Sequence, residues 1–306
     1  MSNEPSGVHP PQLQQVADDV FAYVQAPGGW CLNNAGIIAD ADRVTLVDTA
    51  ATENRARALR KAAATVTPEP PHAIVNTHFH GDHTFGNCVF PEAIVIGHED
   101  TRTQTAEAGL HLTGLWPDVE WGDITVTPPT VTFHDRLTVH TGAVRMELVH
   151  LGPGHSPGDT VVWLPDRSVL FTGDLAMSGV TPFVPMGSVT ASLQALETMR
   201  EWEPRTVVPG HGPVGGPEIL DATERYLLWL RGLAREGVAG GLTPRELADT
   251  AGPGPFGELI DSERLLPNLA RAYAEERGAA PGEPLDIGAL FAEMVDHHGG
   301  LPACHA

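Results

Sequence analysis

A short run of histidine and aspartate residues is the clearest sign of chemistry in this sequence. The segment HFHGDH places His78 and His80 two positions apart and puts Asp82 directly before His83. On a loop, two imidazoles at alternate positions can hold one metal ion, while the adjacent aspartate and histidine hold a second. Imidazole and carboxylate ligands without a thiolate suit zinc, and the ligand types alone also fit iron or manganese.

Three further candidate ligands lie in segments rich in glycine and proline. His155 lies in LGPGHSPGD, Asp174 in VLFTGDL and His211 in VVPGHG, each just past a predicted strand. Glycine permits the tight turns that place a ligand at the edge of a sheet rather than inside it. The seven residues predict a dinuclear centre, in which two ions about 3.5–4 Å apart would acidify a shared water and polarise a carbonyl oxygen.

The elements that must position these residues are predicted from apolar periodicity and turn signals. Strand-like segments at 16–25, 31–39 and 43–47 predict an opening antiparallel meander. A helix follows the N-cap Thr52 and ends near 67–71, and the short apolar strand 72–76 leads directly into HFHGDH. Further strands at 93–96, 131–133, 137–141, 144–150, 160–164 and 169–172, with a helix at 98–108, predict two sheets flanked by helices.

The chain becomes helical after residue 189. The predicted helices span 192–202, 218–239, 244–250, 263–276 and 287–297, and one short strand at 206–208 delivers His211. We therefore expect a flexible N-terminus at 1–15, a main domain at 16–216 and a helical extension at 217–306 with Gly/Pro-rich joints at 252–257 and 278–284.

Composition narrows the class of protein. The 306 residues carry a formal net charge of -21, which opposes binding to nucleic acid because that affinity depends on Lys and Arg. The sequence lacks an export signal and an apolar run long enough to cross a bilayer, so we expect a soluble, cytoplasmic protein. Cys31, Cys88 and Cys304 are irregularly spaced, which predicts reduced thiols, with Cys31 and Cys88 buried as small apolar residues.

The ordered ligand set resembles the metallo-β-lactamase superfamily over residues 16–212. The resemblance implies an α/β fold, the four-layer αββα metallo-β-lactamase sandwich, here with a C-terminal helical extension. It also implies that one metal is held by His78, His80 and His155, a second by Asp82, His83 and His211, and that Asp174 bridges them. Asp82 and Asp174 would be the catalytic residues, together with hydroxide held by the metals.

The same resemblance suggests residues around the metals. Asp48 resembles a carboxylate that braces the ligand loop, although an aspartate can simply end a strand. Trp30 would offer a flat surface to a planar substrate, and Asn33 and Asn34 would offer amide donors; the alternative is a core tryptophan beside two turn-forming asparagines. Candidate apolar walls, against ordinary loop packing, are Phe85, Phe183 and Met186.

Within the superfamily, the segments YVQAPGGWCLNNAG, HFHGDHTFGN, GPGHSPGDTVVWLP and PFVPMGSV look like those of the cyclases of aromatic polyketide pathways. That resemblance implies two Zn²⁺ ions and regioselective aldol cyclisation of a small-molecule polyketide, with thioester hydrolysis as a second step. One alternative is a general thioester or lactone hydrolase similar to glyoxalase II. The others are a secreted β-lactamase, which the lack of an export signal opposes, a metal-dependent nuclease, which the acidity opposes, and a non-catalytic zinc module, which would leave no position for water.

Candidate partners follow from the same resemblance. Acyl carrier proteins are acidic, so docking one would require a local basic patch, and the densest cluster is Arg55, Arg57, Arg60 and Lys61. A solvated helix face is the plainer interpretation of that cluster. The helical extension is a candidate lid, homodimer surface or carrier dock, and neither nucleic acid nor a membrane is expected as a partner.

Overall fold

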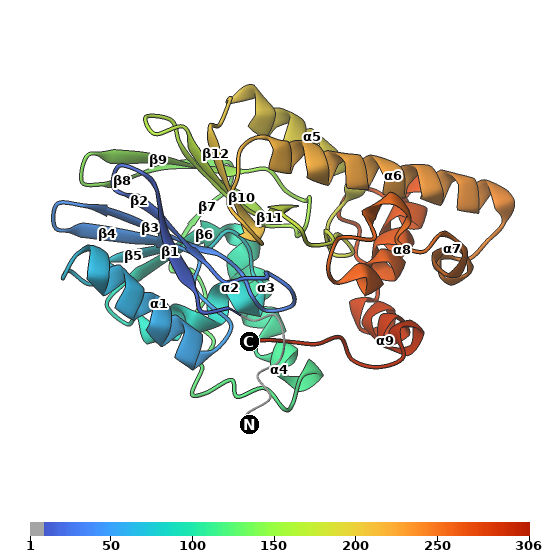
Figure 1. Cartoon of the computed structure of the whole chain (residues 1–306), viewed down its shortest axis with the longest axis horizontal. Helices are drawn as coiled ribbons and strands as arrows, with labels where there is room; N and C mark the ends of the chain where they lie inside the picture. Colours follow the sequence, from blue (N-terminus) through green and yellow to red (C-terminus); the bar gives the residue numbers. More distant parts are fainter. Residues whose placement is uncertain (1–8) are drawn as a thin grey trace.

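The computed structural model describes residues 9–306 and contains two β-sheets that pack face to face (Figure 1). The first sheet has its strands in sequence order: β1 (Gln12–Ala17), β2 (Val20–Val24), β3 (Ala35–Asp40), β4 (Arg43–Val47), β5 (Ala73–Val75), β6 (Ile94–His98) and β7 (Val131–Phe133). The second runs in the order β12 (Thr206–His211), β11 (Val169–Met177), β10 (Thr160–Leu164), β9 (Val144–His150) and β8 (Arg136–Thr141).

The helices lie outside the two sheets and beyond one end of them. They are α1 (Glu53–Val66), α2 (Gly81–Thr84), η1 (Phe85–Val89), α3 (Glu99–Ala108), α4 (His111–Leu115) and α5 (Val189–Glu201). The C-terminal region adds α6 (Glu218–Gly240), α7 (Pro244–Ala251), η2 (Gly254–Phe256), η3 (Ser262–Arg264), α8 (Leu265–Glu276) and α9 (Ile287–His298).

Alternation along the strands produces the layers. Ile38 faces inward and packs in the same core cluster as Phe171 of the second sheet. Its neighbour Ile37 faces outward and packs with Leu59 of α1, because successive strand side chains point to opposite faces. On the other side, Leu170 packs with Leu196 of α5. The order helix, sheet, sheet, helix confirms the predicted αββα fold.

The N-terminal meander differs from its prediction in three places. The strand predicted at 31–39 is β3, which begins only at Ala35, and the other two differences lie earlier in the chain. A flexible segment was predicted up to residue 15, and residues 1–8 lie outside the described chain, but β1 begins at Gln12 and pairs with β2. The predicted strand at 16–25 is interrupted by a turn, in which Asp19 has the left-handed φ of 64°. Asp and Asn tolerate this conformation better than other side chains, so Asp18 and Asp19 were a turn signal that apolar patterning masked.

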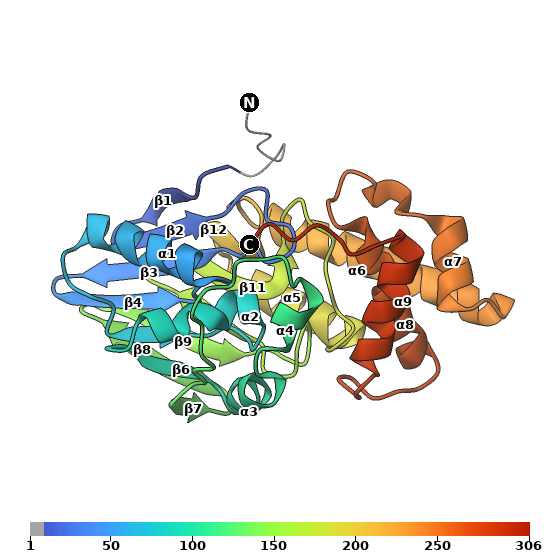
Figure 2. The ribbon, with the colours of Figure 1, turned by 90° about the horizontal axis from the view of Figure 1, so that it is seen from below.

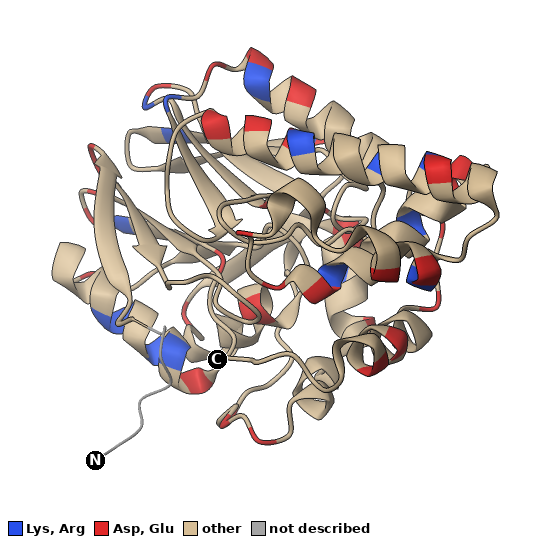
Figure 3. Ribbon diagram, turned by 45° about the vertical axis from the view of Figure 1, so that its right-hand side comes forward, with Lys and Arg blue, Asp and Glu red and all other residues tan. Residues whose placement is uncertain are grey.

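The C-terminal helices match their predictions closely and pack beside one end of the sandwich (Figure 2). α6 presents Leu227 and Leu230 to a core that also contains Leu266, Leu269 and Tyr273 of α8. Acidic residues, red in Figure 3, are distributed along the ribbon of both the sandwich and these helices. Within residues 9–306, the helices are each too short or too polar to cross a membrane.

Candidate metal centre

All seven predicted ligands meet at one edge of the sandwich. The chain leaves β5 and reaches His78 and His80, and the first turn of α2 then supplies Asp82 and His83. The loop between β9 and β10 carries His155. Asp174 lies within β11, which continues to Met177 instead of ending near residue 172, and His211 is the last residue of β12.

The ligand atoms form two groups, and within each group they lie within 4.8 Å of one another. One group contains His78, His80, His155 and Asp174, and the other contains Asp82, His83 and His211. The Asp174 carboxylate also lies between the groups. Its Oδ1 is 3.2 Å from Nε2 of His83, and its Oδ2 is 3.4 Å from Nε2 of both His155 and His211. This is the placement that a bridging ligand requires.

The chemistry of the donor set fits divalent cations. Nε2 of His83 and Oδ1 of Asp174 are buried and have no hydrogen-bond partner. Burying such atoms without a partner costs free energy, and a cation between them would remove that cost. Imidazole nitrogens and carboxylate oxygens suit zinc, and the ligand types alone also fit iron or manganese.

Asp48 holds the ligand loop in the position expected from the sequence. One carboxylate oxygen accepts hydrogen bonds from the His83 ring at Nδ1 (2.8 Å) and the Thr77 hydroxyl (2.7 Å). The other accepts from the Thr77 backbone N–H at 2.8 Å. Nε2 of His83 is thereby directed toward Asp174. Carboxylates that orient a histidine in this way also increase its basicity toward a metal.

Two other histidines are oriented by backbone carbonyl groups. His211 donates from Nδ1 to the carbonyl of Gly28 at 2.9 Å, and His155 donates from Nδ1 to the carbonyl of Phe183. Both rings therefore present Nε2 to Asp174. The Phe183 contact also fixes the loop after β11 beside the centre.

Asp159 is a functional residue that the sequence reasoning missed. Its carboxylate accepts hydrogen bonds from the backbone N–H groups of Gly154, His155 and Ser156 and from the Ser156 hydroxyl, at 2.6 to 3.0 Å. It thus shapes the turn that presents His155. Burial raises the pKa of this carboxyl group. The available signal was the motif HSPGD, with an acidic residue four positions after the ligand.

Charge is distributed unevenly among the ligands. Burial lowers the pKa of His211, but Asp174 and Asp82 outweigh it and raise the pKa to about 9. Burial and the neighbouring His155 lower the pKa of His80 to about 3. Burial raises the pKa of Asp174, but the surrounding histidines, His211 foremost, bring it well below its usual value. The carboxylate therefore remains ionised and favours cations.

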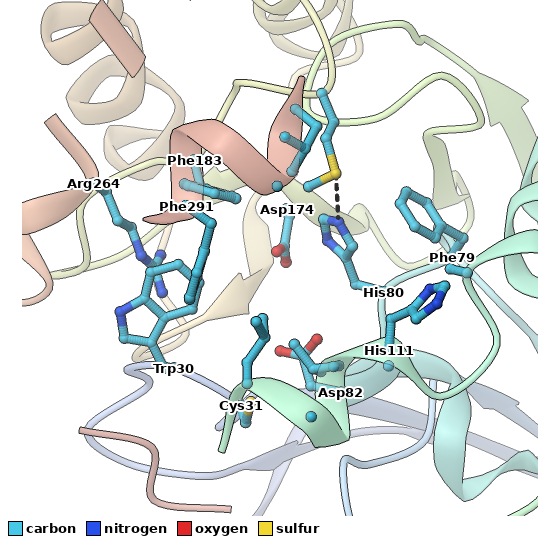
Figure 4. Close-up of a pocket in the computed structure, with 18 of the residues that line it drawn as sticks. Trp30, Cys31, Phe79, His80, Asp82, His111, Asp174, Phe183, Arg264 and Phe291 are labelled. Atoms are coloured by element: carbon cyan, nitrogen blue, oxygen red, sulfur yellow. Dashed lines mark hydrogen bonds between the residues drawn. The ribbon is translucent and has the colours of Figure 1, made fainter. Parts of the chain in front are cut away.

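A cavity of about 750 Å³ opens directly over this centre (Figure 4). Five ligands reach its floor: His80, Asp82, His155, Asp174 and His211. The candidate walls Trp30, Phe85, Phe183 and Met186 all line it. The sequence reasoning missed the roof, which comes from α4 and α9 through Leu112, Leu115, Ile287, Phe291 and Val295.

Trp30 lies at the cavity wall but is held by the helical extension. Its indole N–H donates to Oε1 of Glu263 at 2.6 Å, and the Arg264 guanidinium lies 4.1 Å from the ring centre. Phe183 and Phe291 pack edge-on at 5.3 and 6.1 Å. Only 9% of Trp30 is exposed. Arg264 thus covers part of the ring surface that was expected to face a substrate.

Asn33 and Asn34 do not line the cavity, in contrast to their expected contact with substrate. Asn34 donates through Nδ2 to the carbonyls of Pro209 (2.9 Å) and Gly212 (2.7 Å), and Asn33 donates to that of Thr49 (3.0 Å). Both side chains are buried. Their amide donors are used within the protein, where they fix the first hairpin against the His211 segment.

Comparison with known proteins agrees with this architecture. Residues 28–211 match the model of the metallo-beta-lactamase superfamily. The chain is 27% identical to the type 2 metallo-beta-lactamase of Bacteroides fragilis over 70% of its own length and 84% of that protein. It is 24% identical to a linear primary-alkylsulfatase of Pseudomonas sp. and 26% identical to the human acyl-coenzyme A thioesterase MBLAC2.

The extent of these matches differs. The chain spans about half (48%) of the alkylsulfatase and 59% of the thioesterase. Among solved structures, a metallo-beta-lactamase from Pontibacter korlensis superposes with a TM-score of 0.59 at 21% identity. That match covers 72% of this chain and 99% of the other, and at this identity it shows the fold alone.

Proposed function

Because the chain belongs to the metallo-beta-lactamase superfamily, a family of metal-dependent hydrolase-type enzymes, we propose that it is a dizinc enzyme that closes a ring of an aromatic polyketide by aldol cyclisation. Hydrolysis of the thioester that carries the polyketide is the second reaction open to the same centre. When bound, two divalent ions supply Lewis acidity that polarises a carbonyl oxygen and acidifies water.

The observation that carries the proposal is the apolar cavity over the ligands. Aromatic and aliphatic side chains from five separate parts of the chain line it, and its aromatic members include Trp30, Phe85, Phe183 and Phe291. A cavity of about 750 Å³ falls in the range of sites that enclose ligands of drug-like size. A fused-ring polyketide intermediate matches both its size and its apolar character.

The chain's own groups would supply positioning and proton transfer. An aldol closure removes a proton from a carbon between two ketones and joins that carbon to another carbonyl carbon. The walls would hold the substrate folded so that these two carbons meet above the ligands. Burial raises the pKa of Asp82, but His83 and His211 outweigh it and keep the carboxylate ionised at the cavity floor. Asp82 and Asp174 are therefore the proposed proton-handling groups.

A general thioester hydrolase similar to glyoxalase II is the second candidate, because it would use the same seven ligands and a relative of this chain is a thioesterase. Glutathione and coenzyme A thioesters are anionic, so their enzymes need cationic contacts. Among the described residues, Arg264 is the single Lys or Arg that lines the cavity. Its guanidinium pairs with Asp261 at 2.8 Å, so the cavity favours a neutral, apolar substrate.

The basic cluster on α1 is largely engaged within the chain. Arg57 pairs with Glu53 at 2.6 Å and Arg60 with Glu92 at 2.5 Å. Arg55 donates to Oε1 of Gln25 at 2.8 Å. We therefore propose that selectivity depends on the polyketide itself, with docking of an acyl carrier protein as a secondary contribution.

The test is to offer the purified enzyme a bicyclic polyketide thioester mimic and lactoylglutathione in parallel. We expect cyclised product from the mimic and little turnover of lactoylglutathione. Trp30→Ala should lower kcat/KM for cyclisation at least tenfold, about 1.4 kcal/mol of transition-state stabilisation, with metal content unchanged. Trp202→Ala, which lies outside the cavity lining, is the matched control. Efficient hydrolysis of lactoylglutathione without cyclisation would replace the proposal by the second candidate.

A further inference from the structure

His80 differs from the neighbouring ligand histidines in the ring nitrogen that faces the metal centre. Its Nδ1 lies 3.0 Å from Nε2 of His78 and 2.8 Å from Nε2 of His155. Both neighbours use their own Nδ1 for a hydrogen bond away from the centre, His78 to the hydroxyl of Thr77 at 3.0 Å and His155 to a backbone carbonyl. The three facing nitrogens converge where one ion would bind, so Nε2 of His80 is the nitrogen that points away.

This outward nitrogen of His80 meets a sulfur atom. Sδ of Met186, in the loop between β11 and α5, lies 3.5 Å from it, as the dashed line in Figure 4 shows. A thioether carries no hydrogen to donate and can only accept. The hydrogen bond therefore forms only when Nε2 carries the proton, and the neutral ring then has its lone pair on Nδ1. Met186 thus selects the tautomer of His80 that can bind a metal.

The backbone around Met186 is held on both sides. The carbonyl of Pro185 accepts hydrogen bonds from Nε and Nη2 of Arg271 at 3.1 and 2.8 Å, and this α8 arginine is completely buried. On the other side, a side chain on Gly187 would collide with the carbonyl oxygen of Gly154, which directly precedes a ligand histidine. The helical extension and the loop between β9 and β10 therefore fix the position from which the thioether reaches the ligand.

We propose that Met186 is a positioning residue of the metal centre, whose thioether accepts the Nε2–H of His80 and so directs Nδ1 of that ring toward the ion. The inference goes beyond the proposed function, because it concerns the metal rather than the substrate and holds for cyclisation and hydrolysis alike. Met186 also lines the cavity. One side chain thus contacts both a metal ligand and the space that a substrate would fill.

Sulfur is a weaker acceptor than the oxygen atoms that orient other ligand histidines. A carboxylate oxygen of Asp48 holds His83, and the carbonyl oxygen of Gly28 holds His211, whereas a thioether accepts only weakly. Loss of the outer partner of a metal ligand typically costs about 10- to 100-fold in metal affinity. For a sulfur partner we expect a loss of about tenfold, at the lower end of that range.

Competition with a chelator, on the full-length protein, measures that loss. Met186→Leu keeps the size and apolar character of the side chain and removes the acceptor, so one of the two zinc ions should bind about tenfold more weakly. Met186→Gln returns an acceptor oxygen at a similar reach and should restore the affinity. Met177→Leu is the matched control and should bind zinc like the parent, because that thioether lines the same cavity but contacts Arg264 at 3.5 Å instead of a ligand.

Equal zinc affinities of Met186→Leu and the parent would overturn the proposal, since the sulfur would then contribute nothing to the centre. Equal weakening in Met186→Leu and Met186→Gln would also overturn it, because the shape of the side chain rather than its acceptor would be responsible. A loss in Met177→Leu as large as that in Met186→Leu would have the same meaning.

NMR spectroscopy of zinc-saturated protein tests the hydrogen bond itself. Proton–nitrogen spectra of the histidine rings should place the His80 proton on Nε2. This proton should exchange with water more slowly in the parent and in Met177→Leu than in Met186→Leu, which lacks the acceptor. Equal exchange rates in all three proteins, or a proton on Nδ1, would contradict the proposed bond. Both measurements follow the metal and the protein without a substrate, so failure of the proposed cyclisation would leave their results unchanged.

Discussion

Asp48 connects the first sheet to the metal ligands, and its removal should weaken metal binding. It binds His83 and both polar groups of Thr77, next to His78. Asp48→Ala should lower metal affinity by about 10- to 100-fold, because His83 loses the group that orients it. Competition with a chelator would measure this. Asp42→Ala, at an exposed position near the end of β3, is the control. Equal affinities for the two variants would mean that Asp48 only ends its strand.

The pKa of His211 makes metal uptake pH-dependent. Because Asp174 and Asp82 raise it to about 9, this imidazole carries a proton at neutral pH in chelator-treated protein. Zinc requires the neutral ring, so uptake should release this proton, and affinity should rise as pH increases toward 9. Calorimetry in buffers of different ionisation enthalpy would count the protons. Uptake without proton release at pH 7 would contradict the charge distribution described for the centre.

Single residues also mark the limits of sequence reasoning. The seven ligands could be located because each sits in a glycine-bearing motif beside a predicted strand. The roles of Asn33 and Asn34 could not, because an asparagine amide can serve a substrate or a backbone carbonyl equally well. What decides between these roles is the distance to Pro209 and Gly212, which are remote in sequence.

At the scale of elements, α9 forms part of the cavity roof and buries few of its own side chains. Met294 is its one buried side chain, while Phe291 packs edge-on to Trp30 and Trp116. Phe291→Ala should raise KM for a large aromatic substrate roughly fivefold or more, about 1 kcal/mol, and leave a small thioester unaffected. Glu293→Ala, on the same helix but outside the lining, is the control. An equal loss for small and large substrates would assign Phe291 to folding.

The helices and strands were largely predictable from the sequence, whereas the tertiary contacts between them were not. Apolar periodicity identified most strands and the C-terminal helices to within a few residues. It missed β1, whose partly exposed QLQQVA lacks a strong apolar pattern and becomes a strand by pairing with β2. It also missed the cavity roof. The hydrogen bond between Trp30 and Glu263 joins residues 233 positions apart, and the sequence of neither segment indicates that it contacts the other.

Across the whole molecule, the metal ligands come from the sandwich alone, whereas the cavity above them is lined by both the sandwich and the helical extension. All seven ligands lie before residue 212, while the lining residues Arg264, Phe291 and Leu301 belong to the helical extension. The ligands lie on the sandwich, and the roof of the cavity comes from α4 and α9. Changes of substrate could therefore arise in the extension without disturbing the metal centre.

The negative charge of the molecule favours the binding of cations at that centre. The chain carries a formal charge of -21, and the carboxylates of Asp82 and Asp174 stay ionised where they are buried. Two divalent cations would offset this buried negative charge and would bind the unpartnered atoms of His83 and Asp174. The dinuclear site is thus the claim on which the proposed chemistry depends.

Elemental analysis of freshly purified, full-length protein tests that claim most directly. After zinc supplementation and removal of loosely bound ions, we expect close to two zinc ions per chain, because two groups of ligands share Asp174. Asp174→Ala should reduce the content, since its loss leaves two cations without the shared carboxylate. A value for the parent protein that stays below one ion per chain would contradict the dinuclear centre and the function proposed from it.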